Sequence, residues 1–261
     1  MRITCSKQLM HTNRRCYKMG KVVFHVVLPT ETKMFCGCPV PAMDEEGYYQ
    51  PGMDCPVCCG EKGAYPILNK TAVEEAIAVV LALNGKVTQY TLFDRVKSET
   101  GLYDMISQYS YPIGKEGYVE YALLKEVFLD SDEAAKEDET DLEIGNHSIH
   151  HLDIPVMRLK ESEEEKGIPV LEIVSDPIEE EQNPYYIEAI ETILTALGME
   201  AWEIIETDDL IETMESQKPL SYLPDPDIPP VIISQWWIDQ IAAKYPELIH
   251  IEEPEVEEDD F

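Results

Sequence analysis

Long apolar runs are missing from this chain of 261 residues. No segment approaches the roughly eighteen uninterrupted apolar residues of a membrane-spanning helix, and the N-terminus has no apolar stretch followed by a small-residue cleavage site. These absences exclude a helical membrane protein and a secretory leader. They favour a cytoplasmic protein with no membrane partner, and they leave open a mitochondrial location if the basic N-terminus is a transit segment.

Basic residues are scarce in most of the chain. Residues 101–261 contain eight Lys and Arg against forty-two Asp and Glu, whereas residues 1–100 contain twelve against ten. The net charge of −32 therefore belongs to the second part. A polyanionic surface repels phosphate backbones, whose binding requires Lys and Arg to displace counterions. The negative charge either keeps the protein soluble or attracts a partner with a basic groove. The second case includes mimicry of nucleic acid.

The exception is residues 1–21, which carry six Lys and Arg and no acidic residue. This stretch is one of three things. It is a disordered arm, an extension read from an upstream start codon when translation truly starts at Met19, or an organelle transit segment. We divide the chain into a basic arm (1–19), a folded domain (20–250) and an acidic tail (251–261). There is no internal repeat.

Periodicity predicts a mixed α and β fold. An apolar β-branched run at 20–28 predicts a buried strand, and helical spacing with a polar start and a closing glycine predicts a helix over 69–85. The same reasoning predicts two further strands at 117–129 and 168–177 and two further helices at 183–198 and 231–248. Two segments are too charged to bury and are expected to be solvated loops, namely 130–147 and 160–166.

Five of the seven cysteines lie within residues 36–60. Thiols at such close spacing in a reducing compartment favour a metal over disulfides. Two short pairs, each on a turn rich in proline and glycine, can chelate a tetrahedral ion from two sides and leave no open position, which is the chemistry of structural zinc. The predicted ligands are Cys36, Cys38, Cys55 and Cys58, with Cys59 an adjacent alternative to Cys58.

Several stretches, in order and with similar spacing, resemble the B subunit of the tRNA-dependent glutamyl/aspartyl amidotransferases. They cover most of residues 20–248. These stretches are TKMFCGC (32–38), CPVCCGEKGAYPILNKTAVEEAIAVVLALN (55–84), FDR (93–95), ISQY (106–109), GIPVLEIVSDP (167–177), ILTALG (193–198) and YLPDPDIPPVIIS (222–234).

The resemblance implies a cradle-shaped α/β (α+β) domain, built on an antiparallel sheet with flanking helices and a zinc knuckle. It also implies an ATP and magnesium site that phosphorylates the side-chain carboxylate of a mischarged aminoacyl-tRNA. Ammonia delivered by a partner amidase then displaces the phosphate. Such chemistry needs carboxylate and imidazole ligands that converge on a cation.

Four candidate catalytic residues carry over from the family pattern, namely His25, Ser107, Gln108 and Glu172. Other positions depart from the pattern. The family strand has a carboxylate two residues before the histidine and a polar residue two places after it, and these positions are Val23 and Val27 here. His25 is therefore either a retained functional contact or an inherited core histidine.

Further departures bear on function. The family's lysine is missing from the shortened segment 98–108, and the motif that follows Gly198 is replaced by unrelated residues. Residues 1–261 also lack the helical and tail domains that grip tRNA in the family, so direct tRNA binding is not expected. Three histidines in NHSIHH either bind a second metal or lie in a polar loop, and Asp225 and Asp227 are expected to shape a turn. The three are His147, His150 and His151.

Two functional hypotheses follow. In the first, the chain is a divergent, catalytically degenerate homologue that acts as a zinc-stabilised acidic binding protein. Its partner would be the amidase, for which it competes, or a basic host protein that it meets as a nucleic-acid mimic. In the second, it is a minimal active form, an ATP-dependent carbon–nitrogen ligase that uses ATP and Mg²⁺. The replacement of a ligand carboxylate by Val23 favours the first.

Overall fold

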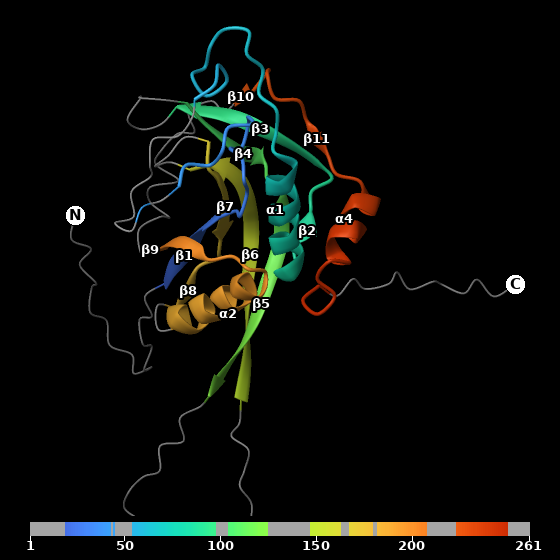
Figure 1. The fold of residues 1–261 in the computed structure, drawn as a ribbon. Helices are drawn as coiled ribbons and strands as arrows, with labels where there is room; N and C mark the ends of the chain where they lie inside the picture. Colours follow the sequence, from blue (N-terminus) through green and yellow to red (C-terminus); the bar gives the residue numbers. More distant parts are fainter. Residues whose placement is uncertain are drawn as a thin grey trace, which may run out of the picture.

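The computed structural model in Figure 1 describes most of the predicted folded domain. The basic arm up to residue 18, nearly all of the charged segment 130–147 and the tail 251–261 lie outside the described residues. The residues described are 19–42, 44, 54–97, 104–124, 147–162, 167–179, 182–207 and 223–249.

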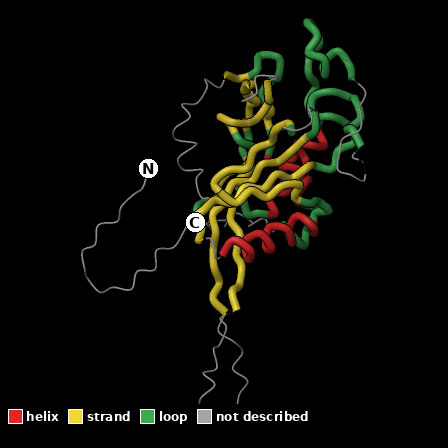
Figure 2. Tube along the Cα trace, turned by 90° about the vertical axis from the view of Figure 1, so that its left-hand side faces the viewer, coloured by secondary structure: helices red, strands yellow, loops and turns green. Residues whose placement is uncertain are grey.

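The centre of the fold is a curved antiparallel sheet with helices against one face (Figure 2). Its strands are β1 Met19–Val27, β2 Lys86–Val87, β3 Tyr90–Lys97, β4 Asp104–Tyr111, β5 Gly114–Leu124, β6 His147–Glu161, β7 Pro169–Val174, β8 Ile178–Glu179, β9 Ala201–Thr207, β10 Leu223–Pro224 and β11 Val231–Ile232. The main order is β10-β3-β4-β6-β7-β1-β8, and every pairing among the described residues is antiparallel. The predicted fold class is confirmed.

Strand β1 lies between β7 and β9, which explains its apolar composition. Val22, Phe24 and Val26 are fully buried on the face that the helices cover. The ring of Phe24 meets Tyr186 of α2 (Asn183–Ala196) edge to face, with ring centroids 5.7 Å apart. The alternate residues of β1 therefore point to the opposite face of the sheet, where His25 lies.

Helix α1 (Lys70–Ala82) is the most buried helix of the core. Asn69 caps its N-terminus, because its Oδ1 accepts a hydrogen bond from the Ala72 N–H at 3.2 Å. The Asn69 amide also donates to the carbonyl of Thr32 at 2.8 Å. One side chain thus joins the start of the helix to the loop that follows β1, which carries the first cysteine pair.

Helix α4 (Gln235–Ala242) lies beside α1 (Figure 1). Ser234 caps it, because its side chain accepts a hydrogen bond from the Trp237 N–H, and the Trp237 indole N–H donates to Glu74 of α1 at 2.9 Å. The helix is shorter than predicted at its start, because residues 231 and 232 pair with β3 as β11.

The prediction of a solvated loop over 160–166 is wrong for its first residues. Strand β6 continues to Glu161, and Lys160, Glu161 and Ser162 are each 6% exposed. Charge alone predicts exposure, whereas the fold supplies a buried partner for Lys160 from a neighbouring strand. Residues 163–166 lie outside the described residues.

We predict that Asn69→Ala lowers the free energy of unfolding by about 1–2 kcal/mol, because it removes the helix cap and the link to Thr32. Urea unfolding followed by circular dichroism measures the change. Asn69→Asp is the matched variant, since it keeps the capping acceptor and loses the amide donor, and its stability should fall between the two. An alanine variant as stable as the wild type would contradict this role.

Candidate functional site

The first cysteine pair lies in a closed loop after β1. The Lys33 N–H donates to the carbonyl of Cys38 at 2.8 Å, and Thr32 pairs with Pro39 in an isolated antiparallel bridge. These contacts hold Cys36 and Cys38 within one tight turn.

The second pair lies in a compact turn at residues 55–60. The Cys59 N–H donates to the carbonyl of Cys55, and the Gly60 N–H donates to the carbonyl of Val57, each at 3.0 Å. Gly60 has a φ of +66°, a left-handed conformation that a glycine adopts without strain. The sequence therefore provides the residue that this knuckle needs at its end.

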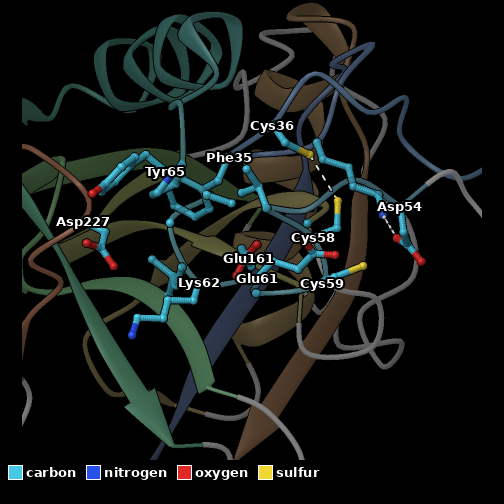
Figure 3. A pocket seen from close by; sticks show the side chains of 18 of the residues that line it. Phe35, Cys36, Asp54, Cys58, Cys59, Glu61, Lys62, Tyr65, Glu161 and Asp227 are labelled. Atoms are coloured by element: carbon cyan, nitrogen blue, oxygen red, sulfur yellow. Dashed lines mark hydrogen bonds and ion pairs between the residues drawn. The ribbon is translucent and has the colours of Figure 1, made fainter.

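The two turns bring four sulfur atoms together, two of which, those of Cys36 and Cys58, are drawn in Figure 3. All four Sγ atoms lie within 4.8 Å of one another, with Cys36 and Cys58 3.3 Å apart and Cys55 and Cys58 3.7 Å apart. A tetrahedral zinc ion with Zn–S bonds of about 2.3 Å would set its sulfurs about 3.8 Å apart. The cluster thus has dimensions compatible with a bound metal. Cys59 is exposed and is not one of the four.

The electrostatics of the cluster also suit a metal. Burial raises the pKa of Cys36 and of Cys38, whereas the backbone N–H of Cys58 lowers the pKa of Cys55 to about 7. A bound cation favours the loss of a proton from all four cysteines, and the resulting thiolate is the form that binds a metal. Burial would lower the pKa of Lys33, but the charge of Cys58 and the ion pair with Asp54 raise it.

A second polar group lies on the sheet face opposite the helices. His25 of β1, Glu172 of β7 and Arg158 of β6 are directly opposite one another across the three strands. Residues paired in this way share one face of a sheet. Arg158 Nη1 lies 2.8 Å from Glu172 Oε1, and the guanidinium lies over the ring of Tyr109 at 5.0 Å.

Lys160 completes this group. Its Nζ lies 3.1 Å from Glu172 Oε2 and 3.3 Å from His25 Nε2, and these two atoms are 3.6 Å apart. The ammonium therefore contacts both the carboxylate and the imidazole, and the lysine side chain is only 8% exposed. Both oxygens of Glu172 are bound to cations that belong to the chain itself.

The pKa of Glu172 follows from these contacts. Burial opposes its ionisation, but the hydrogen bond with His25 and the charges of Lys160 and Arg158 outweigh burial. They hold the pKa of Glu172 far below its usual range. The carboxylate is therefore ionised throughout the neutral range, with its charge balanced within the fold.

The other two predicted catalytic residues, Ser107 and Gln108, point to opposite faces of the sheet. Ser107 of β4 is directly opposite Lys160 and shares its face of the sheet. Gln108 is the next residue, is fully buried, and accepts the Leu159 N–H through Oε1 at 3.2 Å. Strands β4 and β6 have one residue pair in register, and beside it the side chain of Gln108 supplies the acceptor for a backbone N–H of β6. The structure thus brings His25, Glu172 and Ser107 to one face of the sheet. Gln108 points to the other face and hydrogen-bonds the backbone of β6.

The valines flanking His25 lie where the sequence places them. Val23 and Val27 alternate with the buried core residues of β1, so they share the face of His25. Val23 is 8% exposed and pairs with Val174, which is equally apolar. At these two positions the strand offers no ligand to a cation.

The remaining predicted residues have local partners. His151 lies 3.0 Å from Asp153 and stacks on Tyr118, and among the described residues only the four cysteines form a group that could hold a metal ion. His147 begins β6, and its side chain lies outside the described part. Asp225 accepts the Asp227 N–H at 2.9 Å and also pairs with Arg95, which forms the expected turn.

Arg158 and Lys160 are the site residues that sequence reasoning missed. Both lie in the run IPVMRLKES, where two cations alternate with apolar residues in a chain that has few cations. That alternation is the available signal, since two buried cations on one strand face need an acidic partner.

A cavity of about 680 Å³ adjoins the cysteine cluster (Figure 3). It lies between the second cysteine turn, the segment 61–66 and the ends of β3, β4 and β6. Charged residues of both signs and the rings of Phe35 and Tyr65 line it.

The described part of the chain contains no helix long and apolar enough to cross a membrane.

Comparison with known proteins agrees with this geometry. A model of the GatB/GatE catalytic domain matches residues 20–208. Similar proteins include the B subunits of several aspartyl/glutamyl-tRNA(Asn/Gln) amidotransferases. The one from Carboxydothermus hydrogenoformans is 26% identical over 304 residues, and the one from Thermotoga maritima is 24% identical over 307. Each alignment covers 86% of this chain and 60% of the relative.

The relative from Nocardia farcinica is 34% identical over 190 residues, which cover 67% of this chain and 36% of that protein. The chain thus spans about 60% of the length of the first relatives. The family match extends from β1 to the end of β9 and includes both the cysteine cluster and the His25–Glu172 group. The chain therefore belongs to the GatB/GatE catalytic domain family.

Proposed function

We propose that this chain is a catalytically silent form of the GatB/GatE catalytic domain that binds zinc and acts as an acidic binding protein. The observation that carries the proposal is the position of Lys160. Its ammonium contacts both His25 and Glu172, two of the four retained candidate catalytic residues. If Mg²⁺ bound through this imidazole and this carboxylate, it would have to displace the tethered cation of Lys160.

Magnesium chemistry explains why this matters. Mg²⁺ requires near-octahedral oxygen ligands at about 2.0–2.1 Å. Here one oxygen of Glu172 is bound to Arg158 and the other to Lys160, and the position two residues before His25 is Val23. Binding would require breaking two buried ion pairs, and breaking one such pair costs roughly 3–5 kcal/mol. The described side chains therefore do not fit a Mg·ATP site.

The active alternative has one specific observation in its favour. Glu203 of β9 is directly opposite His25 on the other side of β1. By this register it is a candidate to replace the missing carboxylate if Mg²⁺ bound here. Its contribution is therefore part of the test.

We predict that isothermal titration calorimetry detects no saturable binding of Mg·ATP to the wild-type protein. The Thermotoga maritima relative, titrated in parallel, is the positive comparison, because the resemblance implies an ATP site in the family. Saturable binding to the wild type that is lost in Glu203→Gln would overturn the proposal and support the active alternative.

A variant of Lys160 tests whether this side chain prevents a metal ion from binding at His25. Lys160→Ala removes the ammonium between His25 and Glu172, and Mn²⁺ should then broaden the His25 ring signals in NMR spectra of this variant alone. Lys115→Ala, an exposed lysine of β5, is the matched control. Broadening of His25 in the wild type at the same Mn²⁺ concentration would show that Lys160 does not block the site.

The ion pairs also predict how stability depends on pH. A carboxylate whose pKa is lowered by folding stabilises the protein above its unfolded pKa of about 4.3 and loses that contribution as the pH falls. Glu172→Gln should therefore cost roughly 3 kcal/mol at pH 7, since two buried cations lose their partner. The difference should shrink by about 1.4 kcal/mol per pH unit below pH 4.

Urea unfolding at pH 7, 5.5 and 3.5 measures this difference. Glu188→Gln, on the exposed face of α2, makes the same charge change and should be nearly neutral. If Glu172→Gln were neutral or stabilising at pH 7, the internal ion pairs of Glu172 would not hold the fold together as proposed.

Zinc is the proposed resident metal. The donor set is four thiols with the spacing of a tetrahedral site, and its role is to stabilise the turns that carry it. We predict about one zinc ion per chain by elemental mass spectrometry. Cys36→Ser and Cys58→Ser should lose the zinc, whereas Cys59→Ser should retain it. Loss of zinc in Cys59→Ser together with its retention in Cys58→Ser would assign the fourth ligand to Cys59.

The proposed binding role has two kinds of partner. The names of the relatives describe one component of a larger enzyme, which fits competition with an intact component of that kind for the amidase. The net charge of −32 fits a basic protein that otherwise binds nucleic acid.

A further inference from the structure

The cavity beside the cysteine cluster has the size of a ligand site and belongs to no role assigned so far. Its volume of about 680 Å³ lies within the range of small-molecule pockets, about 300–1,000 Å³. Its walls come from several separate segments, since residues of the cysteine turn and the ends of three strands line it. It is therefore a formed cleft and not a gap in one loop.

Most of the cations that line the cavity have carboxylate partners. Lys33 Nζ lies 3.3 Å from Asp54, and Arg95 pairs with the buried carboxylate of Asp225, with Arg95 Nε 2.7 Å from its Oδ2. These pairs neutralise two of the three positive charges in the lining. The third, Lys62, is exposed.

The remaining lining charge is negative. Glu61 and Asp227 are exposed at the cavity, and Figure 3 shows Glu61 between Asp227 and the cysteines. Glu161 also lines the cavity, but it has an interaction within the fold, so its charge is not counted. A Zn²⁺ ion bound to four thiolates adds a formal charge of about −2 beside the two exposed carboxylates. With Lys62 counted, the lining keeps an excess of negative charge, which disfavours phosphates and other anions as ligands.

The aromatic residues of the lining indicate what shape of cation the cavity favours. Phe35 is buried against Phe93, whereas Tyr65 is 69% exposed at the cavity. An aromatic ring beside carboxylates favours a flat cation that stacks on the ring and donates several hydrogen bonds. A guanidinium has this shape, and its five donors match several carboxylates at once.

We propose that this cavity binds the guanidinium group of an arginine side chain on a partner protein. Glu61 and Asp227 would accept its hydrogen bonds, and Tyr65 would stack on its plane. The proposal rests on the proposed role as an acidic binding protein, and it gives that role a specific anchor point. The bulk charge of the chain attracts a basic partner, while the cavity decides which side chain is inserted.

The test is a titration of the zinc-loaded full chain, labelled with ¹⁵N, with the peptide acetyl-Gly-Arg-Gly-amide. We expect saturable shifts of the backbone amides of Gly63, Tyr65 and Gly167, which lie at the cavity. The same peptide with citrulline keeps the shape and removes the charge, and it should bind at least fivefold more weakly. The lysine peptide should fall between the two.

Matched variants separate the cavity from the general acidity. Asp227→Asn and Tyr65→Ala, both at exposed positions, should each weaken arginine binding at least threefold. Glu188→Gln changes the net charge as Asp227→Asn does but lies on α2, and it should leave the affinity unchanged. Both cavity variants should keep their zinc, which shows that they fold.

Three outcomes would overturn the proposal. These are equal binding of the arginine and citrulline peptides, an equal effect of Glu188→Gln and Asp227→Asn, and shifts spread over acidic residues away from the cavity. Mg·ATP added to the same samples keeps the two proposals distinguishable. Nucleotide binding would contradict catalytic silence, whereas failure of arginine to bind would leave that proposal intact.

Discussion

The carboxylate of Glu172 sets the main constraint on this domain. It belongs to β7, between β1 and β6, and is little exposed to water, so an ionised carboxylate in that position must be paired. The chain meets the requirement with Arg158 and Lys160, both from β6. The ion pairs therefore help to fix β6 against β7 and β1, and they determine what else can bind at His25. With two cations for one carboxylate, this group has no net negative charge to attract a divalent cation.

The same use of cations recurs elsewhere in the fold. Lys33 pairs with Asp54 beside the cysteine cluster, and Arg95 pairs with the buried Asp225. Together with the two cations on β6, these make four cations and three carboxylates in internal pairs among the described residues. The pairs take up charges of both signs in nearly equal number, so they leave the strong negative charge of the chain almost unchanged.

Local signals in the sequence predict the elements and the cysteine cluster well. The polar cap at Asn69, the cysteine spacing and the β-branched run of β1 each act within a few residues, so pattern reading finds them. The pairing of Lys160 with His25 joins residues 135 positions apart and depends on strand register. No local pattern encodes that register, which is why charge alone predicts a solvated loop at Lys160. Gln108 is separated from the His25 and Glu172 group for a related reason, because one residue of shift along β4 moves a side chain to the other face.

The two sites of the domain also differ in what they need from the solvent. The cysteine cluster is compatible with a bound metal, and in the proposed zinc form the ion would hold its four thiolates and the two turns together. The Glu172 group is complete without any ligand, since its cations are covalently part of the chain. An ATP-dependent ligase needs the opposite arrangement at its centre, with anionic ligands left unpaired until the metal arrives. In the proposed silent form, Lys160 takes the role of a removable ion, so this part of the fold needs no ion to balance Glu172.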